Sequence, residues 1–139
     1  AIHEHPLPLV VIDMGTATTM SVADKHGNYI GGVILPGLRV SLNSLSGKTA
    51  QLPYISLEVP DKVIGKNTID CMRAGIIFSN VDMIDGLLDR MEKELGEAPT
   101  VIATGGLARF ITPLCRHTII YDDALLLKGL LILYRKNTQ

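Results

Sequence analysis

A continuous apolar run in "LPLVVID" limits the possible folds most strongly, because it ends in Asp13 and Gly15 after only six apolar or proline residues. A run this short without alternation is typical of a strand that is buried on both faces. The following segment, "TTMSVAD", alternates and reaches a turn signal at Gly27 and Asn28. The alternation resumes in "YIGGVILPG". Together these segments predict two antiparallel strands that are linked by a hairpin, with room for a third strand beside them.

Helical spacing begins after the third strand segment. "LRVSLNSLSG", residues 38–47, places leucines on one helical face. Residues 67–96 carry a long helical pattern that Asn67 or Thr68 can cap. Gly75 and Gly86 interrupt that pattern, so we expect either two helices or one bent helix. The segment between the helices, "KTAQLPYISLEVPDKVIGK", predicts a loop with room for one short strand.

The last third of the chain alternates between strands and helices. "PTVIATGG" and "HTIIYDD" predict strands, whereas "LARFITPLC" predicts a short helix. The leucine-rich "ALLLKGLLILYRKN" predicts a final helix whose leucines form core, with some of them at a subunit contact. The sum is a single α/β domain over residues 1–139, with a mixed sheet and flanking helices.

Composition excludes several classes of protein. Hydrophobic residues make up 47% of the chain and charged residues 19%, which argues against a disordered tail. The formal net charge is -1 and the basic residues are dispersed, so we expect neither nucleic acid nor an anionic membrane surface as a partner. No apolar run approaches the roughly 20 residues of a membrane span, and from these residues we expect no leader before the first strand. Two widely separated cysteines indicate reduced thiols and a cytoplasmic location.

Chemistry concentrates where the first strand ends. Gly15 permits close approach of a ligand to the backbone, and the hydroxyls of Thr16, Thr18 and Thr19 add hydrogen-bond donors. Such an array suits an anion, and Asp13 fits beside a phosphate only if a cation lies between them. A hairpin built from β-favouring threonines explains the same residues equally well. The motif alone therefore leaves both interpretations open.

Two further motifs are weaker. "ATGG", residues 103–106, places two glycines at a junction between a strand and a helix, where a flat ligand could lie against the backbone. "GKNT", residues 65–68, supplies Asn67 and Thr68 at a helix start, where capping is the favoured role. "SGKT" is not a phosphate-binding P-loop, because Leu42 occupies the position that requires the first glycine.

Five motifs in this order, "VVIDMGTATT", "GGVILPGL", "KTAQLP", "IGKNT" and "ATGGLA", resemble the second half of type III pantothenate kinases. The resemblance extends from about Leu9 to Asn137. It implies a ribonuclease H-like domain of the actin, sugar kinase and heat-shock ATPase superfamily. It also implies ATP-dependent phosphorylation of pantothenate to 4'-phosphopantothenate, the first step of coenzyme A biosynthesis.

The resemblance implies roles for individual residues. ATP phosphates would be bound by the second phosphate loop, which comprises Gly15, Thr16, Ala17 and Thr18. Asp13 matches a position associated with a monovalent cation, K⁺ or NH₄⁺, in an enzyme that also uses Mg²⁺.

The adenosine of ATP would lie against a second group, Thr104, Gly105 and Gly106. Thr68 matches a threonine that contacts pantothenate across a homodimer.

Two elements of the family are missing from these residues. The family's first phosphate loop, Asp-x-Gly-Asn-Thr, is absent, and its catalytic aspartate in Gly-x-Asp-Arg would precede Ala1. We therefore expect no catalytic base here and no turnover by the 139 residues alone. Two alternatives remain: a non-enzymatic transcription accessory factor of the same family, or half of another actin-like small-molecule kinase.

Overall fold

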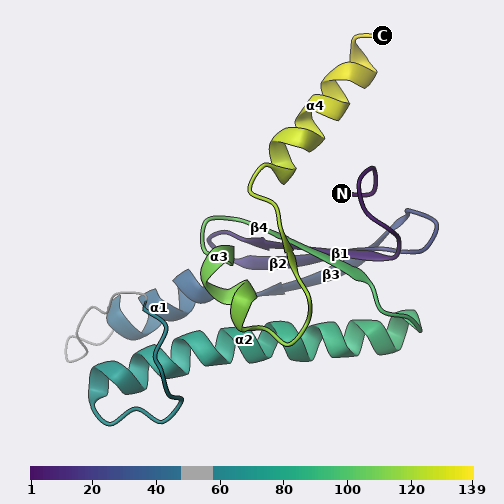
Figure 1. Ribbon diagram of the computed structural model, residues 1–139. Coiled ribbons are helices and arrows are strands. Elements are labelled where there is room, and N and C mark those ends of the chain that lie inside the picture. Colours follow the sequence, from purple (N-terminus) through teal and green to yellow (C-terminus); the bar gives the residue numbers. More distant parts are fainter. Residues whose placement is uncertain (48–57) are drawn as a thin grey trace.

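A five-stranded mixed sheet forms the centre of the molecule (Figure 1). The computed structural model describes residues 1–47 and 58–139. The strands lie in the order β3-β2-β1-β4-β5. β1 pairs antiparallel with β2 and parallel with β4, β2 pairs antiparallel with β3, and β4 pairs parallel with β5. The strands are β1 Leu9–Met14, β2 Thr18–Ala23, β3 Tyr29–Leu35, β4 Thr100–Thr104 and β5 Ile120–Tyr121. The predicted hairpins and mixed sheet are confirmed, and the strand order is that of a ribonuclease H-like domain.

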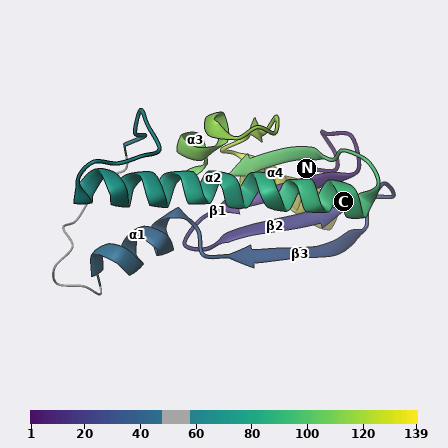
Figure 2. The same ribbon diagram turned by 90° about the horizontal axis from the view of Figure 1, so that it is seen from below.

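Four α-helices accompany the sheet in the described residues. They are α1 Leu38–Gly47, α2 Thr68–Leu95, α3 Ala108–Ile111 and α4 Leu125–Asn137, and a 3₁₀ turn, η1 Thr112–Leu114, follows α3. α2 runs along one face of the sheet, with α1 beside its first half (Figure 2). The "KTAQLP" motif lies outside the described residues, as does most of the loop and short strand predicted for residues 48–66.

The long helical pattern forms one helix rather than two. The side chain of Asn67 accepts a hydrogen bond from the amide of Asp70 at 2.9 Å, which confirms one of the two predicted caps. Gly75 and Gly86 lie within the helix, where a glycine costs about 1 kcal/mol relative to alanine. α2 ends at Gly96, whose φ of 79° is the left-handed conformation of a helix C-cap.

The main core lies between the sheet and α2. Val10, Ile12 and Met14 alternate along β1 toward Ile84 and Leu88 of α2, and all five are buried. A smaller cluster lies on the opposite face of the sheet, where β1, β2 and β4 contact the start of α4; its buried members are Leu9, Ala23, Ile102 and Leu125. Because β1 is buried on both faces, its continuous apolar pattern is explained.

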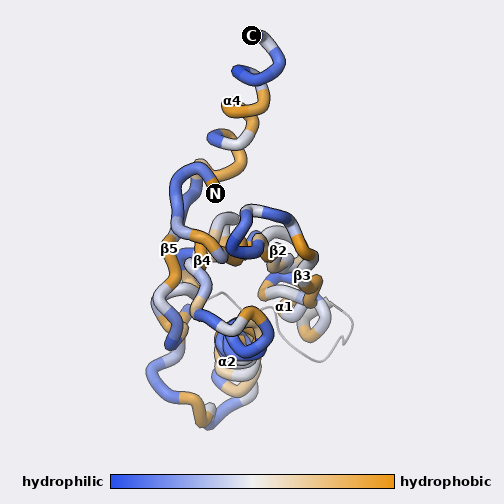
Figure 3. Tube along the Cα trace, turned by 90° about the vertical axis from the view of Figure 1, so that its right-hand side faces the viewer, coloured by the Kyte–Doolittle hydropathy of each residue, from blue (hydrophilic) through white to orange (hydrophobic). Residues whose placement is uncertain are grey.

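The final helix corrects one prediction. α4 extends away from the sheet, and hydrophobic residues recur along it (Figure 3). Leu125 alone is buried, whereas the other leucines are between 46% and 72% exposed: Leu126, Leu127, Leu130, Leu131 and Leu133. The prediction that these leucines form core is therefore wrong for this chain, because a periodic pattern records apolarity but not the surface that covers it. Their place at a subunit contact stays a prediction.

α4 is anchored at its first turns by charge as well as by Leu125. The ammonium group of Lys128 lies 2.8 Å from a carboxylate oxygen of Asp122 and 3.2 Å from one of Glu4.

In the parts of the chain that the structure covers, none of the helices, α4 included, combines the length and apolarity needed to cross a membrane.

Candidate functional site

β1 and β4 end side by side, and their last residues form one edge of the candidate site. In the parallel register Asp13 lies opposite Thr104, and in the antiparallel register it lies opposite Thr19. Directly paired residues point to the same face of a sheet, so the Asp13 carboxylate stands between two threonines. Asp13 is exposed. The carboxyl ends of parallel strands are where open α/β sheets bind ligands.

A cavity of about 290 Å³ lies at the strand ends. It is separate from a cavity of about 360 Å³ beside β3. The smaller cavity joins the turn after β1, the first turn of α1 and the segment after β4. Its lining consists of Met14, Gly15, Thr16, Arg39, Gly106 and Leu107. The two motifs that the sequence placed about 90 residues apart, at Gly15 and Gly106, thus line one cavity.

The turn from β1 to β2 presents polar backbone to this cavity. Gly15 and Thr16 are exposed and Ala17 is half-buried. Within residues 1–47 and 58–139, none of these three amides donates a hydrogen bond to the protein. A Cβ at Gly15 would make only ordinary contacts, the nearest being Asp13 Oδ1 at 3.8 Å, so this turn does not require glycine. The arrangement supplies free donors for an anion.

Thr18 lies differently from the other threonines of the motif. Its side chain is 1% exposed and lies beneath Gly37, where a Cβ would overlap its hydroxyl oxygen. The structure therefore places the Thr18 hydroxyl against the start of α1 rather than in the cavity. Only Thr16 lines the cavity among the threonines predicted to contact phosphate.

The two glycines after β4 have different surroundings. Gly105 has a φ of 106°, and a Cβ there would lie 2.6 Å from the carbonyl oxygen of Met14. Close packing of two backbones therefore explains Gly105. Nothing lies within 4 Å of a Cβ at Gly106, which is exposed and lines the cavity. Of the two, Gly106 is the one whose open face could receive a ligand.

Thr68 is not brought to this cavity. It is the first residue of α2 and is exposed. Asn80, twelve residues later, is the α2 residue whose side chain lies 3.5 Å from Ser41 of α1. At 1.5 Å per residue, Thr68 lies about 18 Å from Asn80, toward the N-terminal end of α2. Its predicted contact with substrate, across a dimer, stays a prediction.

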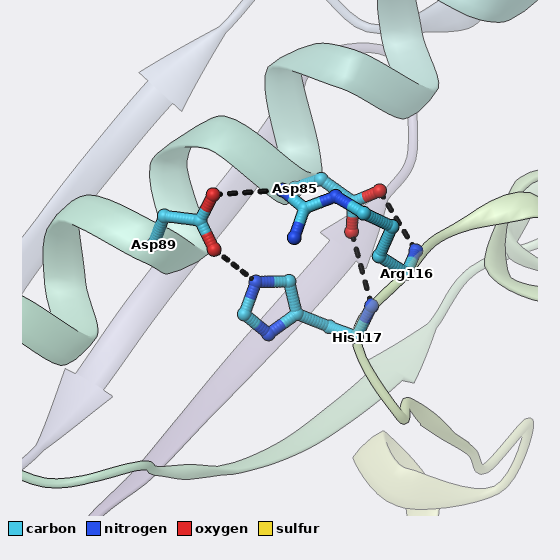
Figure 4. A network of polar contacts seen from close by, with 4 residues as sticks. All are labelled: Asp85, Asp89, Arg116 and His117. Carbon is cyan, nitrogen blue, oxygen red and sulfur yellow. Dashed lines mark hydrogen bonds and ion pairs between the residues drawn. The ribbon is translucent and has the colours of Figure 1, made fainter.

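A polar network that the sequence analysis missed joins α2 to the segment before β5 (Figure 4). Asp85 is 3% exposed and accepts hydrogen bonds from the backbone amides of Arg116 at 2.8 Å and His117 at 3.2 Å. The carboxylate of Asp89 lies 2.7 Å from the Arg116 guanidinium and 2.7 Å from His117 Nε2. The hydrogen bond from Arg116, followed by the one from His117, holds the pKa of Asp89 below its usual value. The sequence carried one signal for this network: Asp85 is a charged residue next to Ile84, among the buried positions of α2.

The same network bears on the neighbouring thiol. Burial first, and then the carboxylates of Asp85 and Asp82, raise the pKa of Cys115 to about 12. Cys71 is exposed, and neither thiol forms a disulfide within the described residues.

We therefore expect one fast and one slow thiol when the native chain is titrated at pH 8 with a disulfide reagent such as dithiobis(nitrobenzoate). The thiolate is the reactive form, and the raised pKa of Cys115 leaves few of its thiols ionised at that pH. Cys71→Ser should remove the fast phase, whereas Cys115→Ser should leave it unchanged. Equal rates for both thiols in the native chain would contradict the burial of Cys115.

The site offers a single carboxylate for a cation. Among the described residues no group of three or more histidine, cysteine, aspartate or glutamate side chains could hold a metal ion. One carboxylate suits Mg²⁺, which keeps several waters and is usually bound by one or two carboxylates and by substrate phosphates. Asp13 therefore fits a cation that a bound phosphate would help to hold, and it does not form an all-protein metal centre.

The fold and the cavity define the class first: a ribonuclease H-like α/β domain with an anion-compatible cavity at the carboxyl ends of its parallel strands. The sequence model of type III pantothenate kinases matches residues 1–90. A type III pantothenate kinase of Bacillus cytotoxicus is 43% identical over 130 residues, which cover 94% of this chain and 50% of the relative. The chain therefore belongs to the type III pantothenate kinase family, and it spans about half the length of this curated relative.

A solved structure supports the fold. The crystal structure of a Campylobacter jejuni protein assigned to the Baf family of transcriptional activators superposes with a TM-score of 0.71 at 23% identity. The similarity covers 94% of this chain and 59% of that one. At this level of identity the comparison bears on the fold alone.

Proposed function

We propose that this chain is the second of two halves of an enzyme that transfers the γ-phosphate of ATP to pantothenate. The observation that carries the proposal is the cavity shared by the Gly15–Thr16 turn and Gly106. Membership in the type III pantothenate kinase family supports the substrate. The products are 4'-phosphopantothenate and ADP.

In this proposal the two sides of the cavity bind different parts of ATP. The free amides of Gly15, Thr16 and Ala17, with the Thr16 hydroxyl, bind phosphate oxygens. The backbone at Gly106 receives the adenosine, and Thr104 and Gly105 hold that backbone against β1. The role of Thr18 in this proposal is structural, as a residue of β2, because its hydroxyl is buried.

Asp13 holds a cation beside the phosphates. Its carboxylate would bind Mg²⁺ or a monovalent cation, K⁺ or NH₄⁺, which neutralises phosphate charge when bound. Without a cation, the exposed Asp13 carboxylate would repel the phosphates that the neighbouring amides attract.

The reaction needs groups beyond these 139 residues. A hydroxyl oxygen of pantothenate attacks the γ-phosphorus, the bond from phosphorus to the ADP oxygen breaks, and the hydroxyl proton passes to a base. We propose that the first half of the enzyme supplies the base. Thr68, remote from this cavity, serves the pantothenate site of the other subunit in a homodimer.

Gly106→Val tests the proposed ATP site directly. The added side chain would occupy open space on the cavity wall, so we expect ATP affinity to fall at least about tenfold with little change in stability. Gly75→Val on α2 is the matched control, because a Cβ there also meets nothing within 4 Å. Isothermal titration with ATP measures both variants. Unchanged ATP affinity in Gly106→Val would contradict the adenosine role.

A further inference from the structure

Among the described residues, Arg39 is the one charged side chain that lines the cavity between Gly15 and Gly106. None of the motifs discussed above assigns it a function. It is exposed, and within residues 1–47 and 58–139 it forms neither a hydrogen bond nor an ion pair. Asp13 lies close to the same turn, but it makes no ion pair with Arg39 within 4.0 Å. A guanidinium without a protein partner is thus available on the cavity wall.

The packing of α1 fixes where Arg39 lies. Leu38 and Leu42 are buried in the core and set the rotation of the helix. Gly37, directly before α1, packs on Thr18 so closely that its missing Cβ would lie 3.2 Å from the Thr18 amide. The start of α1 is therefore seated on the same hairpin that carries Gly15 and Thr16. Because Arg39 directly follows Leu38, this packing places Arg39 on the cavity wall.

The local charge favours an anion here. The first turn of α1 contains no acidic residue that would neutralise Arg39. The partial positive charge of a helix N-terminus adds to that of the guanidinium. Across the cavity, the amides of Gly15 and Thr16 are free donors. A phosphate group bound between these two walls would accept hydrogen bonds from both.

We propose that Arg39 binds the phosphate groups of the nucleotide and determines the preference for a polyphosphate over a nucleoside. This inference rests on the proposed function and adds a residue to it. Arginine is suited to the role, because its planar fork donates two parallel hydrogen bonds to one phosphate. The amides of the Gly15 turn hold the phosphate from one side, and Arg39 closes the other.

The test compares Arg39→Gln, Arg39→Lys and the unchanged chain in titrations with ATP, ADP and adenosine, followed by NMR. Arg39→Gln should weaken ATP binding about tenfold to a hundredfold and leave adenosine binding unchanged, because only the phosphates lose a partner. Arg39→Lys should lie between them, since lysine keeps the charge but not the fork. Arg90→Gln, an exposed arginine of α2 outside this cavity, is the matched control and should bind ATP normally.

The outcomes separate this inference from the function on which it rests. If the unchanged chain binds ATP and Arg39→Gln binds it equally well, the role of Arg39 is refuted and the nucleotide site stands. An equal loss for ATP and adenosine would also refute it, since that result indicates a structural role. If the unchanged chain binds neither ATP nor adenosine, both the nucleotide site and the inference fail.

Discussion

Gly105→Ala is expected to lower the free energy of unfolding by about 3 kcal/mol. Two effects act together at this position. The φ of 106° is a conformation that a residue with a Cβ rarely adopts, and the added methyl would lie 2.6 Å from the Met14 carbonyl oxygen. The neighbouring atoms are backbone atoms of the central strand, so they cannot move aside as a flexible side chain could.

The adjacent glycine provides the control for this experiment. Gly106→Ala places the same methyl group where nothing lies within 4 Å, and no positive φ is required there. We expect a change within about 0.5 kcal/mol for Gly106→Ala. Urea denaturation followed by circular dichroism measures both variants. Equal stabilities for the two variants would show that β4 does not pack against β1 as described.

Asp85→Ala is the second large effect, and we expect a loss of about 2–4 kcal/mol. The carboxylate is 3% exposed and accepts the backbone amides of Arg116 and His117, so its removal leaves two donors in a partly buried place without partners. Asp85→Asn keeps the shape and one acceptor oxygen. Its loss of stability should therefore be smaller.

Asp82→Ala is the matched control, because Asp82 is an exposed aspartate three residues earlier on the same helix. Its stability should change by less than about 0.5 kcal/mol. Amide hydrogen exchange locates the effect: Asp85→Ala should accelerate exchange at Arg116 and His117 first. If Asp85→Ala and Asp82→Ala are equally stable, Asp85 does not join α2 to the segment before β5.

The hairpins and their polar end could be predicted from the sequence because local chemistry determines them. Alternation, the turn at Gly27 and the apolar run that precedes Asp13 in β1 indicate strands without reference to the rest of the chain. Likewise, Asp13 and the Gly15 turn follow directly from where β1 ends. The resemblance assigns Gly15 and Gly106 to different parts of one ATP molecule, and their proximity arises in the structure from the parallel pairing of β1 with β4.

The rest depended on packing between distant segments. Arg39 joins the cavity only because Leu38 and Leu42 fix the rotation of α1. Asp85 is a lone polar residue in a helical pattern, and its partners lie 31 and 32 residues away. The leucines of α4 have the pattern of core residues, yet nothing in the described residues covers them beyond Leu125.

We propose that these residues form the second half of a pantothenate kinase. The most direct measurement is ATP-dependent phosphorylation of pantothenate, followed by ADP release and by the mass of the product. It compares the 139-residue chain with a longer protein. In that protein the same residues follow a first half that carries the family's first phosphate loop and its catalytic aspartate. We predict turnover by the joined protein and none by the chain alone. A joined protein that does not phosphorylate pantothenate, or a 139-residue chain that does, would contradict the account.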